Sequence, residues 1–303
     1  MIWEDVRKHY LRPEVSREIT EYCANRWVAI HCEEAPDGVR PMIRYWGRGK
    51  PLTIERENDI VEILERFSSM RPRAFYATAH IYRRLQSADD LADRENIARS
   101  SPTWDIDSRD GDWRKVVKKA LEIVDELERH GVAKSIFFKW SGRGAHVHVH
   151  PRAFSDDVLR RISPLDIAYS VTQHIACRIE PEEGVVVENK IDVQRVFTAP
   201  LSLHRSVDRV AVCTPPDELR ASTWTGPVPP DTGISRMPGA SMRRAREMSS
   251  RRKPMPPSGR ISPGEPRGGV SISRLIRRFW KLSGSSGYSI RSSISAKTSP
   301  TRM

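Results

Sequence analysis

The sequence predicts an α+β fold, in which helices pack against a mixed or antiparallel sheet. Three observations support this prediction. Short runs rich in β-branched and aromatic residues outnumber the helical stretches. Turn-forming residues, such as Pro36-Asp37-Gly38, separate neighbouring runs. Each helical stretch carries one apolar stripe, as helices that cover one face of a sheet do. With 303 residues, the chain has room for one large domain or two ordinary ones.

The first hundred residues are expected to form two helices and three strands. Pro13, followed by apolar residues at helical spacing, predicts the start of the first helix. The polar segment 86–101 is expected to be a loop. The predicted helices cover 14–24 and 55–68, and the predicted strands cover 26–33, 40–46 and 73–79.

The middle of the chain is expected to place two candidate motifs at strand ends. A short strand at 103–107 is followed by a long amphipathic helix, which Gly131 closes. A second strand then leads into a glycine-containing turn and a third strand. The predicted elements are strands at 103–107, 135–140, 145–150 and 209–213, and helices over 112–130 and 164–179.

The charge of the chain is concentrated at its C-terminal end. The net charge is +12, but residues 236–303 hold 16 Lys and Arg against two Glu, so the remainder is slightly acidic. From about residue 226, Pro, Ser, Gly and Arg dominate and hydrophobic periodicity disappears, so we expect a folded domain at 1–225 and a basic, disordered tail at 226–303. An apolar stripe with arginines around it predicts a short helix at 270–283. That helix is either a docking segment, a stray amphipathic run or an out-of-frame translation product.

The cysteines and the hydropathy exclude several protein classes. The four cysteines lie far apart without a Cys-x-x-Cys pair, so neither a disulfide framework nor a zinc site is predicted. No apolar run is long enough to span a membrane, and the N-terminus lacks a signal-peptide core. We expect a cytoplasmic, nucleoid-associated protein with reduced thiols and no membrane partner.

Two aspartates on one strand are the first candidate site. Asp105 and Asp107 are two residues apart, so both side chains lie on the same face of the predicted strand. Carboxylate oxygens suit Mg²⁺ or Mn²⁺, and Asp192, between Ile191 and Val193, is the candidate third ligand. Such a set is typical of two-metal catalysis, in which one ion holds a triphosphate and the other activates a hydroxyl.

The turn Ser141-Gly142-Arg143-Gly144-Ala145-His146 is the second candidate site. Its small residues allow a ligand to approach the backbone, and Arg143 adds a fixed cation. This combination suits the binding of a polyphosphate at the edge of a sheet. Alternation along the following strand places His146, His148 and His150 on one face. We interpret His148 and His150 as supporting or edge residues.

Taken together, these motifs resemble those of the archaeo-eukaryotic primase superfamily, whose catalytic small subunits share three motifs. The Asp-x-Asp motif matches Asp105-Ile106-Asp107, and the Ser-Gly turn matches residues 141–146 with one residue fewer. The hydrophobic-Asp motif matches Ile191-Asp192, and the Pro-x-Ser-x-His segment matches Pro200-Leu201-Ser202-Leu203-His204. Arg17-Glu18-Ile19 is similar to the family's Arg-Glu-aromatic segment. Thr198 stands where the family usually has a basic residue, and Arg205 stands where it commonly has a lysine. Residues 108–140 contain no cysteine, so the zinc motif of several family members is absent there.

The resemblance implies a primase-like catalytic core over about 1–220 that synthesises primers on single-stranded DNA from nucleoside triphosphates. Asp105, Asp107 and Asp192 would hold Mg²⁺ or Mn²⁺, with no zinc, and a primase large subunit is the implied protein partner. The implied nucleotide contacts are Ser141, Arg143, His146 and His204, with Arg17 and Arg44 as weaker candidates.

Three other functions stay open on the sequence. One is a stand-alone repair polymerase of the same superfamily, of the type found beside end-joining ligases. The altered phosphate-contact residues would also suit a non-catalytic subunit that binds nucleic acid. A metallo-phosphohydrolase that uses His146, His148 and His150 with the aspartates is the remaining alternative.

Overall fold

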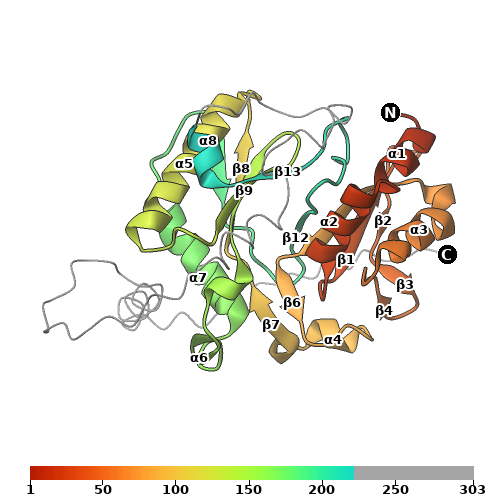
Figure 1. The fold of residues 1–303 in the computed structure, drawn as a ribbon, viewed down its shortest axis with the longest axis horizontal. Coiled ribbons are helices and arrows are strands. Elements are labelled where there is room, and N and C mark those ends of the chain that lie inside the picture. The colour runs from red at the N-terminus through yellow and green to blue at the C-terminus, as the bar shows by residue number, and fades with distance from the viewer. Residues whose placement is uncertain (222–303) are drawn as a thin grey trace, which may run out of the picture.

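The structure is a computed structural model that describes residues 1–221 of the chain. Two antiparallel sheets organise these residues, one of strand order β12-β5-β1-β2 and one of order β11-β8-β10-β9-β13. Figure 1 shows the first sheet with helices α1 to α3 on one side of the molecule, and the second with α5, α7 and α8 on the other.

The first sheet is built mainly from the N-terminal part of the chain. Its strands are β1 (Val28–Cys32), β2 (Met42–Ile43), β5 (Pro72–Thr78) and β12 (Val196–Thr198). Its helices are α1 (Trp3–Tyr10), α2 (Pro13–Cys23) and α3 (Glu57–Arg66). Fully buried Ile19, Ile30, Ile60 and Phe75 join helices and strands in one apolar core. The apolar stripes on α2 and α3 are therefore the faces that pack inward.

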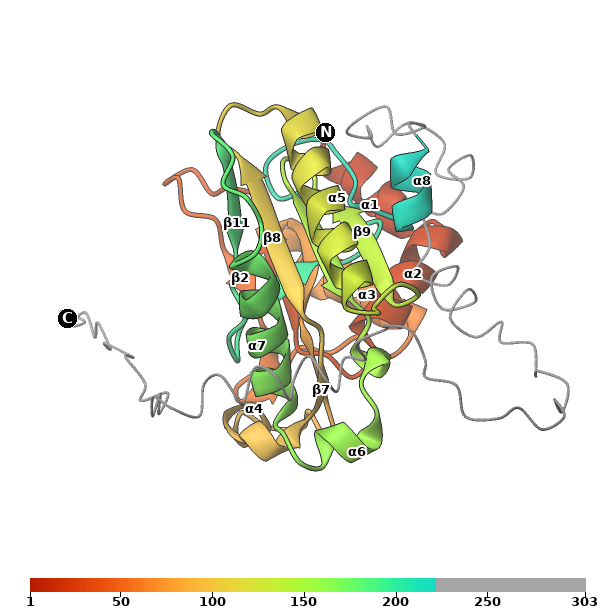
Figure 2. The same ribbon diagram turned by 90° about the vertical axis from the view of Figure 1, so that its left-hand side faces the viewer.

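The second sheet carries both motifs that the sequence singled out. Its strands are β8 (Thr103–Ser108), β9 (Ile136–Trp140), β10 (Ala145–Val149), β11 (Val185–Glu188) and β13 (Val212–Thr214). Helices α5 (Trp113–Arg129) and α7 (Pro164–Ala176) cover its outer face, and α8 (Pro216–Arg220) packs beside α5 (Figure 2). The buried side chains Trp104, Ile123, Phe138 and Val147 fill the space between this sheet and its helices.

Strand β9 links the two halves of the molecule. Phe138 points into the core under α5, whereas Phe137 belongs to the core of the first sheet. Lys139, which is fully buried, donates from Nζ to the carbonyl oxygen of Thr198 on β12 at 2.7 Å. Because side chains alternate along a strand, the inner face of β9, β10 and β8 looks toward the first sheet. Asp105, Asp107 and His146 lie on this inner face.

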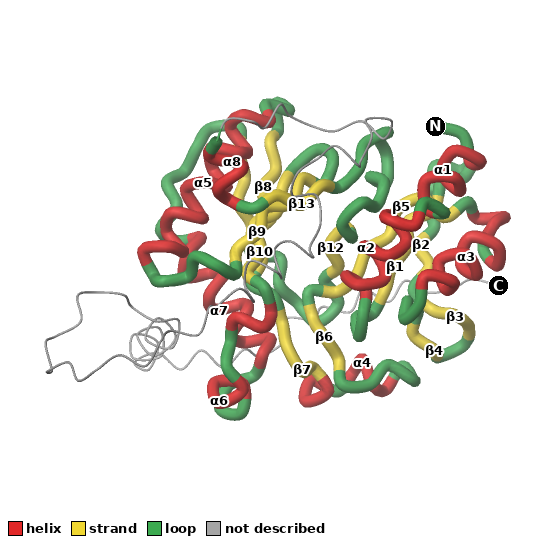
Figure 3. The backbone as a smooth tube through the Cα atoms, viewed as in Figure 1, coloured by secondary structure: helices red, strands yellow, loops and turns green. Residues whose placement is uncertain are grey.

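Shorter elements complete the fold (Figure 3). Two hairpins pair β3 (Tyr45–Gly47) with β4 (Lys50–Pro51), and β6 (His80–Tyr82) with β7 (Ile97–Ser100). Two short helices are α4 (Asp89–Ala92) and α6 (Asp156–Leu159), and single 3₁₀ turns cover Ser68–Met70, Arg94–Asn96 and Pro151–Ala153.

The predicted α+β fold with antiparallel sheets and flanking helices is confirmed. The prediction of a loop at 86–101 was wrong, because this polar segment contains α4 and strand β7, whose first and last residues are buried. The single strand predicted at 40–46 is two strands in different sheets, which separate at Arg44. Helix α1 and strand β11 were not predicted.

The predicted tail at 226–303 and its helix at 270–283 lie outside the described residues. Within residues 1–221, none of the helices has the length and apolar character needed to cross a membrane.

Candidate active site

The acidic half of the site comprises Asp105, Asp107, Glu188 and His146. The register of neighbouring strands positions these side chains. Strand β8 pairs with β10, which places Asp105 opposite His146, and with β11, which places Glu188 opposite Asp105. Residues opposite each other in antiparallel strands point to the same face, so these side chains meet. The Nε2 atom of His146 lies 3.2 Å from Oδ1 of Asp105. Asp105 is mostly buried, whereas Asp107 is half-exposed.

Lys190 lies among these carboxylates, and the sequence analysis did not select it. Its Nζ atom is 2.8 Å from Oδ2 of Asp105, 2.7 Å from Oε2 of Glu188 and 3.6 Å from Oδ2 of Asp107. The signal in the sequence was weak, because Glu188 and Lys190 are two ordinary charged residues after a short valine run. Only the pairing of β11 with β8 brings them to the aspartates.

The neighbours of the two aspartates shift their pKa values in opposite directions. Burial alone would raise the pKa of Asp105, but the hydrogen bonds from His146 and Lys190 outweigh it and hold that pKa well below its usual range. Burial and the negative charge of Asp105 raise the pKa of Asp107. Burial also lowers the pKa of His146, which keeps the imidazole neutral near pH 7. Asp105 is therefore firmly ionised.

The glycines of the Ser-Gly turn bring the acidic half into contact with a basic half. A Cβ atom on Gly144 would lie 2.5 Å from Oδ1 of Asp107 and 2.6 Å from the carbonyl oxygen of Ile106. Gly142 has φ +119°, and a Cβ atom there would lie 2.8 Å from Cβ of His204. Both positions thus require glycine, one for close approach and the other for conformation as well. The turn touches Asp107 on one side and His204 on the other.

Ser141 closes this turn. Its backbone N–H and its hydroxyl both donate to the carbonyl oxygen of Gly144, at 2.9 and 3.0 Å. Arg143, at the tip, is exposed to solvent. The predicted polyphosphate turn is therefore closed by two hydrogen bonds and carries an exposed arginine at its tip.

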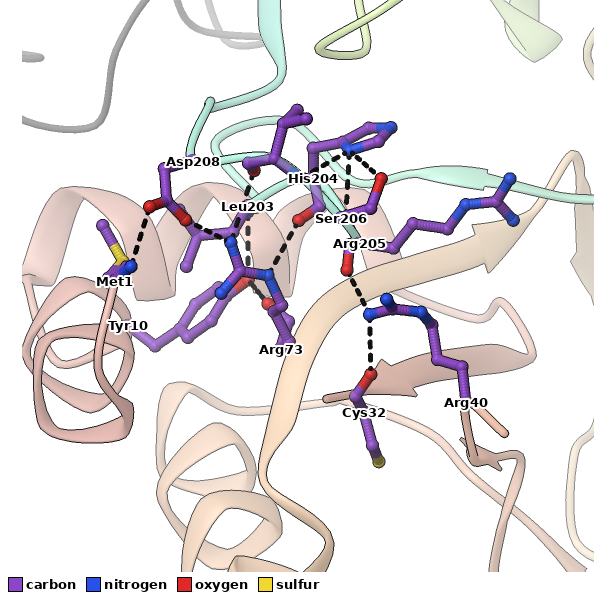
Figure 4. A network of polar contacts seen from close by, with 11 residues as sticks. Met1, Tyr10, Cys32, Arg40, Arg73, Leu203, His204, Arg205, Ser206 and Asp208 are labelled. Atoms are coloured by element: carbon purple, nitrogen blue, oxygen red, sulfur yellow. Dashed lines mark hydrogen bonds and ion pairs between the residues drawn. The ribbon is translucent and has the colours of Figure 1, made fainter. Parts of the chain in front are cut away.

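The late histidine, His204, is held in one tautomer. Its Nδ1 atom accepts hydrogen bonds from the backbone N–H groups of Ser206 and Val207, at 3.1 and 3.2 Å (Figure 4). Burial, together with nearby cations such as Arg205 and Arg143, lowers its pKa to about 4. The ring is therefore neutral at pH 7, and its remaining proton is on Nε2, as a hydrogen-bond donor.

A network of polar contacts holds the loop that carries His204 (Figure 4). Arg73 donates from Nε to the carbonyl oxygen of His204 at 3.2 Å and forms an ion pair with Asp208. Arg40 donates to the carbonyl oxygens of Cys32 and Arg205. These contacts use the inner arginines, whereas the side chains of Arg205 and Arg209 stay exposed.

The exposed arginines give this half a net positive charge that the sequence analysis did not identify. Arg209 donates from Nη1 to the carbonyl oxygen of Gly142 at 3.0 Å, beside the tip arginine of the turn. Arg205, Arg209 and Arg143 all depress the pKa of His204 by their charge. An anionic ligand next to His204 would meet three guanidinium groups.

Asp192, the predicted third metal ligand, lies in a different set of contacts. Its Oδ1 accepts from the backbone N–H of Gln194 at 2.8 Å, and its Oδ2 lies 3.3 Å from Nη2 of Arg195. Its carbonyl oxygen is 2.7 Å from Nε2 of His80. Its negative charge also raises the pKa of Arg44, so these two residues are neighbours.

The remaining candidates are placed as follows. Arg44 stacks with its Cζ 3.3 Å from the ring centroid of Trp27, and burial lowers its pKa to about 10. Arg17 lies on α2, where its Nε is 3.7 Å from Oε1 of Glu57 on α3. The structure brings Asp105, Asp107, His146, Ser141, Arg143 and His204 together, whereas Asp192, Arg44 and Arg17 make their contacts with other residues.

The three histidines of β10 do not form one set. His148 is buried, bonded to the hydroxyl of Thr103 at 2.8 Å and stacked on Phe137. His150 follows the strand and accepts through Nδ1 from the backbone N–H of Arg152. His146 contacts Asp105, whereas His148 bonds to Thr103 and His150 to the backbone of Arg152, which disfavours a three-histidine metal centre.

The carboxylates of the acidic half are the type of ligand that binds a divalent cation. Asp105, Asp107 and Glu188 offer carboxylate oxygens, the ligands that Mg²⁺ and Mn²⁺ prefer. Within residues 1–221, however, no group of three or more His, Cys, Asp or Glu side chains is arranged so that it would hold a metal ion. The ammonium group of Lys190 lies between two of the three carboxylates.

Comparison with known proteins establishes the fold. No protein-family model matches the chain, and no curated protein matches its sequence. Among solved structures, the chain is similar to the polymerase domain of Mycobacterium tuberculosis ligase D, determined in complex with DNA. The TM-score is 0.53 with 15% sequence identity, over 76% of this chain and 86% of that chain. At this identity the likeness shows a shared fold.

Proposed function

We propose that the chain is a nucleotidyltransferase that joins nucleoside triphosphates on a single-stranded DNA template, as a primase catalytic subunit does. One observation carries the proposal: the glycine turn lies between ionised Asp105 with Asp107 and the cationic surroundings of His204. Carboxylates for a divalent ion and donors for a triphosphate are thus arranged within one site.

The residues of the basic half would bind and orient the triphosphate. Arg143, Arg205 and the Nε2–H of neutral His204 are donors that would offset negative charge on the leaving pyrophosphate. Arg209 keeps the turn in place through Gly142. Because His204 is held by backbone hydrogen bonds before a substrate arrives, its Nε2–H needs little reorganisation during the reaction.

The residues of the acidic half would bind a divalent cation, Mg²⁺ or Mn²⁺. When bound, such an ion neutralises triphosphate charge and acidifies an attacking hydroxyl. Asp105 is kept ionised and oriented by His146, and Asp107 is held against the turn by Gly144. We keep Asp192, which follows β11 and is a neighbour of Arg44, as a proposed third ligand.

A second candidate, fill-in synthesis by a repair polymerase, is favoured by the fold shared with the ligase D polymerase domain. The two candidates differ in the DNA end that they need. A primase starts on unprimed single-stranded DNA, whereas a fill-in polymerase extends a recessed 3′ end. The assay therefore uses both templates with the full chain alone, which also tests whether a large subunit is required.

The experiment incubates the full chain with each template, labelled nucleotides and Mn²⁺. Two variants are compared: Asp105→Ala/Asp107→Ala, and the control Asp157→Ala/Asp217→Ala, which removes two exposed carboxylates elsewhere. The proposal predicts products from the wild type and the control only. DNA binding without synthesis would support the non-catalytic subunit, and phosphate release without oligomers would support the hydrolase.

A further inference from the structure

Lys190 forms ion pairs with carboxylates in the acidic half of the site. Its ammonium group lies within 2.8 Å of carboxylate oxygens from two strands, Asp105 on β8 and Glu188 on β11, and 3.6 Å from Asp107. Its side chain is 25% exposed, so solvent screens the contact only in part. Three carboxylates share this one cation.

The backbone on both sides of Lys190 is anchored. Asn189 donates to the carbonyl oxygen of Tyr169 and to Gln173, both on α7. Ile191 is 6% exposed and packs in an apolar cluster with Leu165 and Phe197. The carbonyl oxygen of Lys190 accepts from Nε of Arg195 at 2.8 Å. The ammonium group is therefore delivered to the carboxylates by a fixed segment.

The ammonium group of Lys190 hinders the binding of a divalent ion at these carboxylates. An ammonium ion and a divalent cation compete for the same carboxylate oxygens, and they repel each other at contact distances. The ammonium group of Lys190 occupies the space between the carboxylates of Asp105 and Glu188, at 2.8 and 2.7 Å.

We propose that Lys190 is a tethered cation that fills one cation position of the site, between Asp105 and Glu188, and that a divalent ion binds there only by displacing it. Lys190 thereby sets the metal affinity of the site, and Glu188 is the third carboxylate of that position. The inference rests on the proposed role of Asp105 and Asp107 as metal ligands.

The test measures Mn²⁺ binding to the full chain by electron paramagnetic resonance of the free ion, without nucleotide or DNA. Lys190→Met keeps an unbranched side chain and removes the charge. We expect this variant to bind Mn²⁺ at least tenfold more tightly, or to bind one more ion per chain. Lys190→Arg keeps the positive charge and should bind like the wild type.

Two controls locate the effect. Lys118→Met removes an exposed lysine that pairs with Glu182 on the outer face, and it should leave Mn²⁺ binding unchanged. Adding Asp105→Asn to Lys190→Met should abolish the gain. Circular dichroism and the thermal midpoint verify that each variant is folded.

Unchanged or weaker Mn²⁺ binding by folded Lys190→Met would overturn the inference. The same result together with metal-dependent oligomer synthesis by the wild type would overturn this inference alone. A gain in Mn²⁺ binding without synthesis by any form of the protein would instead overturn the proposed function.

Discussion

The two halves of the candidate site are built in different ways. The acidic half lies on neighbouring strands, where the pairing of β8 with β10 and β11 positions Asp105, His146 and Glu188. The basic half lies on loops, and His204 is positioned by backbone hydrogen bonds and by Arg73. Strand pairing therefore positions the charges of the acidic half, whereas a network of polar contacts positions the loop of the basic half.

The largest expected effect follows from breaking the contact between the halves. In Gly144→Ala, the new methyl group would collide with Asp107 and with the backbone of β8, which must shift. Overpacking of this kind costs about 1–3 kcal/mol and displaces the neighbouring groups. We expect nucleotide incorporation to fall by about a hundredfold, since positioning errors act directly on the barrier.

The matched control is Gly47→Ala, because a Cβ atom at that glycine meets nothing within 4 Å. Equal activity of both variants would show that the turn does not depend on close approach to Asp107.

A smaller effect is expected from removing the support of the basic half. The hydroxyl of fully buried Ser202 accepts from the backbone N–H of Phe75 at 2.8 Å and donates to the carbonyl oxygen of Leu203. Ser202→Ala leaves that buried N–H without its partner, which costs about 1–3 kcal/mol of unfolding free energy. Urea denaturation measures this loss, and Ser69→Ala, at an exposed serine, serves as the control.

The acidic half should respond little to this change. Mn²⁺ binding by folded Ser202→Ala is expected to match the wild type, because strand register holds Asp105. A parallel loss of Mn²⁺ binding would show that the two halves are not independent.

The pH dependence of the unfolding free energy tests whether Lys139 is buried between the two sheets. Burial lowers its pKa from 10.5 to about 7 in the folded protein. Between these values the unfolded chain binds more protons, so the unfolding free energy rises with pH. Relative to Lys139→Met, we expect the wild type to gain about 1 kcal/mol per pH unit from pH 7 to 9. Urea denaturation measures this free energy for both proteins. If their difference does not change with pH, Lys139 is solvated in the folded protein.

The smallest effect on stability is expected for the exposed arginines. Arg143→Ala and Arg205→Ala should each change the unfolding free energy by less than about 0.5 kcal/mol, as surface substitutions do. Each should nevertheless weaken nucleoside triphosphate binding about fivefold, and less so at high salt. Arg48→Ala, on the β3–β4 hairpin, is the control in the same titration. Unchanged binding by both site variants would exclude the basic half from triphosphate recognition.

The fold could be predicted from the sequence where local patterns are strong. The apolar stripe of α5 and the alternation of β8 and β10 follow from residue spacing alone. The segment 86–101 was misread because its polar residues form structure through side chains. Asp90, for example, accepts hydrogen bonds from the backbone N–H groups of Gln86 and Ser87.

The candidate site was predictable only in part for a related reason. Asp105, Asp107, His146 and His204 stand in motifs whose spacing can be read along the chain. Lys190 becomes part of the site only through the pairing of β11 with β8, a contact between distant segments. Such long-range register has no local signal.

The most direct measurement is the synthesis of labelled oligomers on unprimed single-stranded DNA, with the full chain, nucleoside triphosphates and Mn²⁺. We predict oligomers from the wild type and from Asp157→Ala/Asp217→Ala, and none from Asp105→Ala/Asp107→Ala. Equal synthesis by all three proteins, or none by the folded wild type, would contradict the account.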